Sequence, residues 1–175
     1  MKTSRSGFTI VELVIVIAVI GILAAITVVA YNGIQEGAKD SAIRGGATQL
    51  VKALQSWSGR TGKTPLQTGG GYAGNGTGWV AANYPSSSYP NSIETVLFQA
   101  GYLPDDFTIS LPANEAYSSN KEYSTYMLYS CGEKYVVYAY LNSPTAEDTA
   151  RFDRATAECG RGVMGYHMKT AYIFD

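Results

Sequence analysis

The most prominent hydrophobic pattern in the chain is a long apolar run close to its N-terminus. Between Phe8 and Tyr31 the sequence reads FTIVELVIVIAVIGILAAITVVAY, and Glu12 is its only charged residue. Residues 13–30 alone would span about 27 Å as an α-helix, which nearly matches the ~30 Å hydrocarbon core of a bilayer. The pattern predicts a membrane-spanning helix over residues 8–31.

An amphipathic pattern follows the apolar run. Apolar residues recur at steps of four and three, at Ile43, Ala47, Leu50, Leu54 and Trp57. This spacing predicts that the helix continues over residues 32–57 with one buried face, so that a single helix extends from Phe8 to about Trp57. Glycines interrupt this stretch, and each costs about 1 kcal/mol of helix stability relative to alanine. We expect the helix to be weak at Gly33, Gly37, Gly45 and Gly46.

The remaining residues, 58–175, show the mixed patterns of a globular head. Residues 58–92 are rich in Gly, Ser, Asn and Pro, which predicts a long loop with at most short strands. Asn91 can cap a short helix, with Glu94 as its capping-box partner and Gly101 as its stop.

Strand patterns dominate the second half of the head. Tyr123–Ser130 and Tyr135–Leu141 are near-alternating runs of β-branched and aromatic residues, and the four residues between them are typical of a hairpin turn. We therefore predict an α+β fold in which the long N-terminal helix packs on an antiparallel sheet. Further elements are predicted at the helix Ala146–Glu158, capped by Thr145, at a last strand or strand pair Met164–Phe174, and at a short strand Phe107–Leu111.

Glu12 lies in apolar surroundings and needs a partner. A charged residue at the centre of a membrane costs about 2.5–3.5 kcal/mol, and less near the interface. No Lys, Arg or His lies between Phe8 and Tyr31 to pair with it. The best candidate partner is a new amino terminus created by cutting the chain after Gly7. The alternative is a glutamate that reaches the lipid headgroups from the membrane interface.

These residues resemble a known family. The segment GFTIVELVIVIAVIGILAAI combines a glycine that ends a short basic leader, a phenylalanine, a glutamate four residues later and a long apolar run. It is similar to the N-terminal signature of type IV pilins and type II secretion pseudopilins. The resemblance implies that a prepilin peptidase cleaves after Gly7, removing the leader 1–7, and N-methylates Phe8. It also implies that Glu12 pairs with the Phe8 ammonium of a neighbouring subunit.

Some features of the chain bear on this resemblance. Thr9 and Ile10 are expected only to continue the helix. Many type IV pilins carry a proline two residues before the tyrosine that ends the apolar run, but Val29 occupies that position here, so no proline kink is expected. In the family the segment after the long helix is a variable surface loop, which fits the glycine-rich loop of this chain. A simple N-terminal anchor is the alternative, although it leaves Glu12 and the Gly7–Phe8 junction unexplained.

Charge restricts the partners that the chain can have. It contains 13 Lys and Arg against 14 Asp and Glu, a net charge of −1, which becomes −3 when Lys2 and Arg5 leave with the leader, before the new amine is counted. This balance is not the basic footprint of a DNA-binding protein, so direct binding of nucleic acid is not expected. The two leader cations predict a cytoplasmic N-terminus by the positive-inside rule, with the head on the outer side.

Cysteine and histidine usage restricts the chemistry further. Cys131 and Cys159 are the only cysteines, and an even count in an exported domain favours a disulfide worth about 3–4 kcal/mol. Two free thiols are the alternative. We expect no metal and no cofactor, because one histidine, His167, and two cysteines do not make a four-ligand site. Asp105–Asp106 and Asp148–Asp153 fit turns and helix caps. An enzyme is not expected, because the sequence contains no recognisable catalytic set.

The resemblance implies a structural subunit of a type IV pilus-like filament that serves adhesion, motility or DNA uptake. Its expected partners are copies of itself, related minor pilins, the prepilin peptidase, the membrane and, indirectly, an assembly platform with its ATPase. It would begin as a single-pass protein of the inner (cytoplasmic) membrane and end in a cell-surface pilus. A pseudopilin of a type II secretion system is the alternative within the family. A membrane-tethered enzyme or a DNA-uptake receptor is the alternative from another class.

Overall fold

A computed structural model describes residues 7, 9–70, 78–80, 92–104, 107, 126–160 and 168–175 of the chain. The chain divides into two compact units, Met1–Ala38 and Lys39–Asp175, and the long helix α1 contributes to both. The long N-terminal helix and the antiparallel sheet confirm the predicted α+β class. The elements follow in the order α1 (Ile10–Thr61), η1 (Pro65–Thr68), β1 (Gly78–Trp79), α2 (Ile93–Gln99), β2 (Tyr126–Cys131), β3 (Lys134–Tyr140), α3 (Ala146–Cys159) and β4 (Met168–Phe174).

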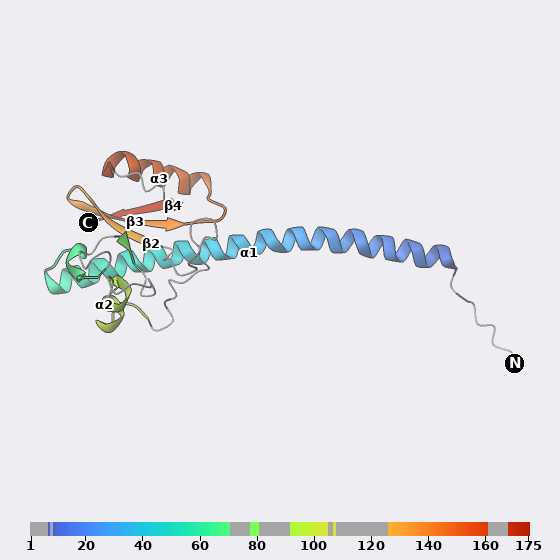
Figure 1. The fold of residues 1–175 in the computed structure, drawn as a ribbon, viewed down its shortest axis with the longest axis horizontal. Coiled ribbons are helices and arrows are strands. Elements are labelled where there is room, and N and C mark those ends of the chain that lie inside the picture. Colours follow the sequence, from blue (N-terminus) through green and yellow to red (C-terminus); the bar gives the residue numbers. More distant parts are fainter. Residues whose placement is uncertain are drawn as a thin grey trace. The chain divides into compact units, whose positions relative to one another are not determined.

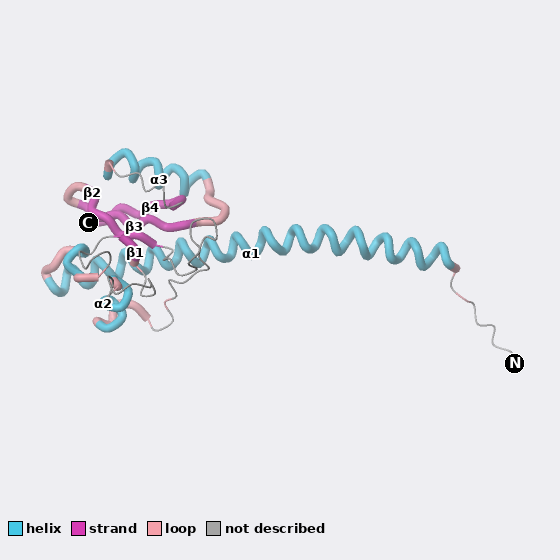
Figure 2. Tube along the Cα trace, viewed as in Figure 1, coloured by secondary structure: helices cyan, strands magenta, loops and turns pink. Residues whose placement is uncertain are grey.

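The sheet is antiparallel, with its strands in the order β1-β2-β3-β4. Figure 1 labels β2, β3 and β4, and Figure 2 labels all four strands. β2 and β3 form the predicted hairpin, in which Cys131 faces Lys134 across the turn. Gly132 lies in this turn with a φ of 63°, a left-handed conformation that glycine adopts without steric cost. β4 pairs with β3, so β1 and β4 form the two edges of the sheet.

Within the second unit, a helix packs on each face of the sheet (Figure 2). On one face the apolar stripe of α1, Ile43 to Trp57, meets Tyr126 and Val137 in the main core. The five predicted stripe positions are at most 6% exposed, which confirms the amphipathic pattern of this part of the helix. On the other face α3 buries Ala155, and the ring centre of Phe152 lies 5.9 Å from that of Tyr138.

A close approach explains one of the glycines in α1. A Cβ atom on Gly46 would lie 2.2 Å from the hydroxyl oxygen of Tyr126, far inside contact distance. That buried hydroxyl donates a hydrogen bond of 2.9 Å to the carbonyl oxygen of Ile43. Burial also raises the pKa of Tyr126 above its ordinary value. The helix is continuous through all four glycines, where weakness is predicted, and at Gly46 the packing requires the missing side chain.

Two charged residues one turn apart on α1 hold the connection between β3 and α3. The buried Asp40 carboxylate accepts hydrogen bonds from the backbone N–H groups of Asn142, at 2.8 Å, and Ser143, at 2.7 Å. The Arg44 guanidinium donates to both oxygens of Asp148, and its shortest contact, Nη2 to Oδ2, is 2.6 Å. We refer to Asp40 and Arg44 with these partners as the α1 clamp.

Asp148 also takes part in the cap at the start of α3. The Thr145 side chain accepts a hydrogen bond from the Asp148 N–H at 3.2 Å, and Asp148 Oδ2 accepts one from the Thr145 N–H at 2.9 Å. This reciprocal pair is a capping box and confirms the predicted cap. The hydrogen bond from Arg44 holds the pKa of Asp148 well below its usual range. Burial opposes this effect, and the hydrogen bonds from Thr145 add to it.

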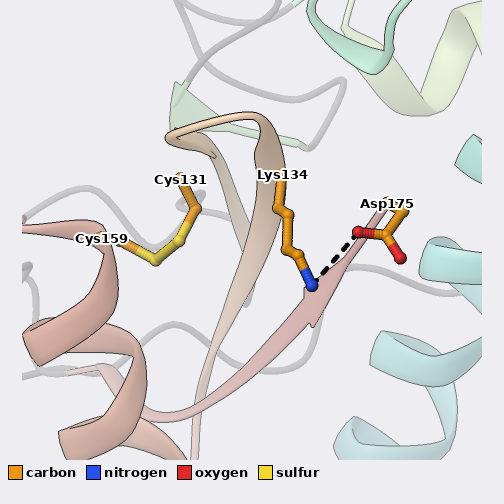
Figure 3. The surroundings of a disulfide bond; sticks show 4 residues. All are labelled: Cys131, Lys134, Cys159 and Asp175. Atoms are coloured by element: carbon orange, nitrogen blue, oxygen red, sulfur yellow. Dashed lines mark ion pairs between the residues drawn. A yellow bond between two sulfur atoms is a disulfide. The ribbon is translucent and has the colours of Figure 1, made fainter.

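A disulfide joins the end of β2 to the last turn of α3 (Figure 3). The Cα atoms of Cys131 and Cys159 are 4.4 Å apart, and their bond ties α3 to the hairpin turn. In the same region, Lys134 Nζ lies 3.3 Å from the carboxylate of Asp175, which pairs the start of β3 with the C-terminal residue.

The ends of α1 differ from the prediction. The helix begins at Ile10 instead of Phe8 and ends at Thr61 instead of about Trp57, and the Gly62 N–H still donates a hydrogen bond of 2.9 Å to the carbonyl oxygen of Ser58. Some predictions fall wholly or partly outside the described part of the chain. They concern residues 1–6 of the leader, Phe8, residues 71–77 and 81–91 of the loop (Asn91 included), Asp105–Asp106, residues 108–111, residues 123–125 and residues 164–167 (His167 included).

The start of α2 also differs from the prediction. Ser92, and not Asn91, is its N-cap, because the Ser92 hydroxyl accepts a hydrogen bond from the Thr95 N–H at 3.0 Å. This bond spans three residues, so Thr95 takes the helical position that the prediction gave to Glu94. The helix ends just before Gly101, whose φ of 74° confirms the predicted stop.

Candidate functional site: the apolar N-terminal helix segment

The first unit presents a helix segment that is apolar on all sides. Its described large apolar side chains, from Ile10 to Ile34, are between 48% and 82% exposed. None of an 18-residue apolar stretch is buried, and by length and composition this helix can cross a membrane. A helix that is hydrophobic all round requires lipid or other helices around it. We call residues 10–34 the apolar segment.

The apolar segment satisfies its own polar groups. The hydroxyl of Thr27 donates a hydrogen bond of 2.7 Å to the carbonyl oxygen of Leu23, one turn back along the helix. Backbone groups bond within the α-helix, which is the condition that lipid imposes on a spanning segment. Glu12 is the one ionisable side chain between Thr9 and Tyr31, so the chemistry of the segment is concentrated at its start.

Glu12 forms a capping box with Thr9 at the start of α1. Its Oε2 atom accepts a hydrogen bond from the Thr9 N–H and another from the Thr9 hydroxyl, both at 2.8 Å. The Thr9 hydroxyl oxygen in turn accepts a hydrogen bond from the Glu12 N–H at 3.3 Å. The negative charge also lies at the helix N-terminus, where the helix dipole favours it.

This geometry corrects the role expected for Thr9. Thr9 does not merely continue the helix but is its N-cap, and it gives Glu12 a partner within the same chain. The signal was present in the sequence, because a threonine followed three residues later by a glutamate, directly before an apolar run, is the pattern of a capping box.

The carboxylate keeps one oxygen for a further partner. Within the described residues, Glu12 Oε1 accepts no hydrogen bond, whereas Oε2 accepts two. Gly7 is exposed, and a Cβ atom there would meet no described residue within 4 Å. The pairing of Glu12 with the Phe8 ammonium of another copy stays a prediction.

The described part of the chain contains no cluster of side chains that could bind a metal ion. Groups of three or more His, Cys, Asp or Glu side chains that could hold an ion do not occur there. Both cysteines are engaged in the disulfide.

The fold and this segment define a protein with an α+β head and an N-terminal helix built to be covered by lipid or by other helices. Residues 2–28 match the family model described as the prokaryotic N-terminal methylation motif. This motif is the signature of type IV pilins and pseudopilins, and the chain carries it. Comparisons with curated proteins and with solved structures gave no match.

Proposed function

We propose that this chain is a structural subunit of a type IV pilus-like filament. A prepilin peptidase would cleave it after Gly7 and methylate Phe8, and the processed chain would wait in the cytoplasmic membrane before it packs with copies of itself and with minor pilins. The methylation motif at residues 2–28, continued by the exposed apolar segment, is the observation that carries this proposal. Energy would come from a separate assembly ATPase, as the resemblance to type IV pilins implies.

The glycines of the first unit support packing against other helices. A Cβ atom on Gly21, Gly33 or Gly37 would meet nothing within 4 Å, so the fold of the single chain does not require these glycines. Each nevertheless costs about 1 kcal/mol of helix stability relative to alanine. Small residues let helix backbones approach each other closely in a membrane, which suits Gly21 within the predicted span of residues 8–31.

The capping box supports a two-stage role for Glu12. Before assembly, the two hydrogen bonds from Thr9 partly compensate the carboxylate, which lowers the cost of holding it near lipid. During assembly, Glu12 Oε1 would accept a hydrogen bond from the Phe8 ammonium group of a neighbouring subunit. A charge-assisted bond of this kind is directional, so it would set the axial register between adjacent helices while apolar contacts supply most of the buried area.

Substitutions at positions 9 and 12 separate the two stages. Glu12→Gln keeps an oxygen that can accept the Thr9 hydrogen bonds but removes the charge. Thr9→Val removes the capping hydroxyl, at a cost of about 1 kcal/mol, but keeps the charge. We expect Glu12→Gln to insert into membranes normally and to form few or no filaments by electron microscopy, whereas Thr9→Val retains most filaments. Wild-type numbers of filaments in Glu12→Gln would exclude the charge pairing.

A pseudopilin of a type II secretion system is the second candidate, because pilins and pseudopilins share the motif. The composition of extracellular filaments decides between the two. A pilus subunit should be present in filaments purified from the medium, at high abundance if it is the major subunit. A chain that is absent from such filaments, and whose deletion abolishes secretion of a folded exoprotein, would be a pseudopilin.

A further inference from the structure

The second unit contains a hollow of about 390 Å³ at the edge of the sheet. α1 lines one side of it with residues that include Val51 and Lys52, and α3 lines the other side with Arg151 and Arg154. β4 forms its floor. We call this hollow the β4-edge groove.

The groove encloses the edge of β4 and not one face of it. Ala171, Tyr172 and Ile173 all line it, although consecutive side chains of a strand point to opposite faces. Tyr172 packs with the core on the α1 face, whereas Ala171 and Ile173 pack with the cluster on the α3 face. Within the described chain, no strand pairs with this edge. Its backbone N–H and C=O groups, which no strand of the described chain pairs with, are a template for another strand.

Cations flank this edge on both sides. Lys52 and Arg154 form no ion pair within the described residues. Arg151 pairs with Glu147, and its guanidinium carbon lies 5.3 Å from the ring centre of Tyr172. This contact joins α3 to a ring that packs on the α1 face, so an added strand would have to displace the Arg151 side chain. None of the described residues that line the groove is acidic. Because Glu147 neutralises Arg151, the positive charge that the groove offers comes from Lys52 and Arg154.

We propose that the β4-edge groove binds an extended, acidic segment of another protein, which joins the sheet as a strand beside β4. Backbone hydrogen bonds to β4 would supply affinity, and the flanking cations would select the sequence. A second copy of this chain presenting the same edge is a poor occupant, because the two sets of cations would then face each other.

The positions of the cations specify the ligand further. Neighbouring side chains of an added strand point to opposite faces, one toward α1 and the next toward α3. Lys52 lies on the α1 side and Arg154 on the α3 side. Two adjacent carboxylates in the bound segment would therefore meet one cation each.

Binding can be measured with the full-length chain in detergent micelles, which makes the result independent of filament assembly. The probe is a fluorescent peptide of about the length of β4, made of valine and threonine with two adjacent glutamates at its centre. We expect saturable binding, with the largest NMR shifts at the amides of Ala171, Tyr172 and Ile173. The double substitution Lys52→Glu with Arg154→Glu should weaken binding at least about tenfold, which corresponds to 1.4 kcal/mol.

Three controls keep the proposal falsifiable. Arg60→Glu with Lys63→Glu makes the same charge change at exposed sites outside the groove and should leave binding unchanged. Lysines in place of the two glutamates, or N-methylation of alternate peptide bonds, should abolish binding. Equal binding of the lysine peptide, equal loss in both double variants, or tighter binding of inorganic phosphate or of a single-stranded oligonucleotide at the same amides would overturn the proposal.

Discussion

Gly45 and Gly46 are neighbours in α1 with opposite surroundings. A Cβ atom on Gly46 would overlap the Tyr126 hydroxyl at 2.2 Å, whereas one on Gly45 would meet nothing within 4 Å. One glycine is thus required by the packing of the helix on the sheet, and the other only weakens the helix. The two glycines look alike in the sequence, and only the packing of Tyr126, 80 positions after Gly46, distinguishes them.

This contrast predicts the effect of alanine at each position. Gly46→Ala should lower the free energy of unfolding by about 1–3 kcal/mol, because a well-packed site must shift to admit a methyl group. Gly45→Ala should raise it by about 0.5–1 kcal/mol. Denaturant unfolding in micelles, followed by the fluorescence of the buried Trp57, measures both. Adding Tyr126→Phe should recover part of the loss in Gly46→Ala, and equal effects of the two alanines would contradict the packing argument.

At the scale of elements, local signals were predictable and distant contacts were not. The stripe of α1, the β2–β3 hairpin and the Thr145 cap follow from periodicity and from residues within one turn. The clamp pair Arg44–Asp148 joins residues 104 positions apart, and no local pattern announces it. The β4-edge groove was equally hidden, because it depends on which strand lies at the edge of the sheet.

The α1 clamp makes the attachment of α3 sensitive to acid. The pKa of Asp148 is lower in the folded than in the unfolded chain, so its carboxylate contributes stability above its unfolded pKa of about 4. That contribution is lost as the pH falls toward the lower, folded pKa. We expect the free energy of unfolding to decrease below about pH 4.

Asp148→Asn should lower stability near neutral pH by about 1–3 kcal/mol and flatten the acid part of the curve. Asp153→Asn, at an exposed carboxylate on the same helix, should leave the curve unchanged. The free energy of unfolding is measured with denaturant between pH 2 and pH 6. If it falls with pH as steeply in Asp148→Asn as in the wild type, the acid sensitivity comes from other groups.

At the scale of the whole molecule, the two units are built for different solvents. The first unit exposes apolar side chains around its helix, whereas the second buries its apolar residues in two clusters on the faces of one sheet. The apolar run and the methylation motif made the first unit predictable from sequence. The order of strands and the groove of the second unit arise from long-range pairing, which composition and periodicity do not encode.

Processing of the whole chain should be visible in its mass. We expect the mature protein to begin at Phe8 with one added methyl group, because the peptidase would remove residues 1–7 and modify the new amine. Mass spectrometry of intact protein from membranes and from filaments measures this directly. Material that retains Met1 in filaments would contradict the proposed maturation.

The disulfide closes the chain between Cys131 and Cys159 and leaves α1 outside the closed loop. Within the described contacts, the buried stripe packs the second half of α1 on the sheet, and Asp40 and Arg44 attach it to residues 142–148, with no covalent crosslink between them. A tensile force entering the molecule along α1 would therefore strain this interface first, and the crosslinked stretch could not extend until it was reduced. A subunit under load would have two mechanical thresholds, an early one set by helix detachment and a late one set by redox chemistry.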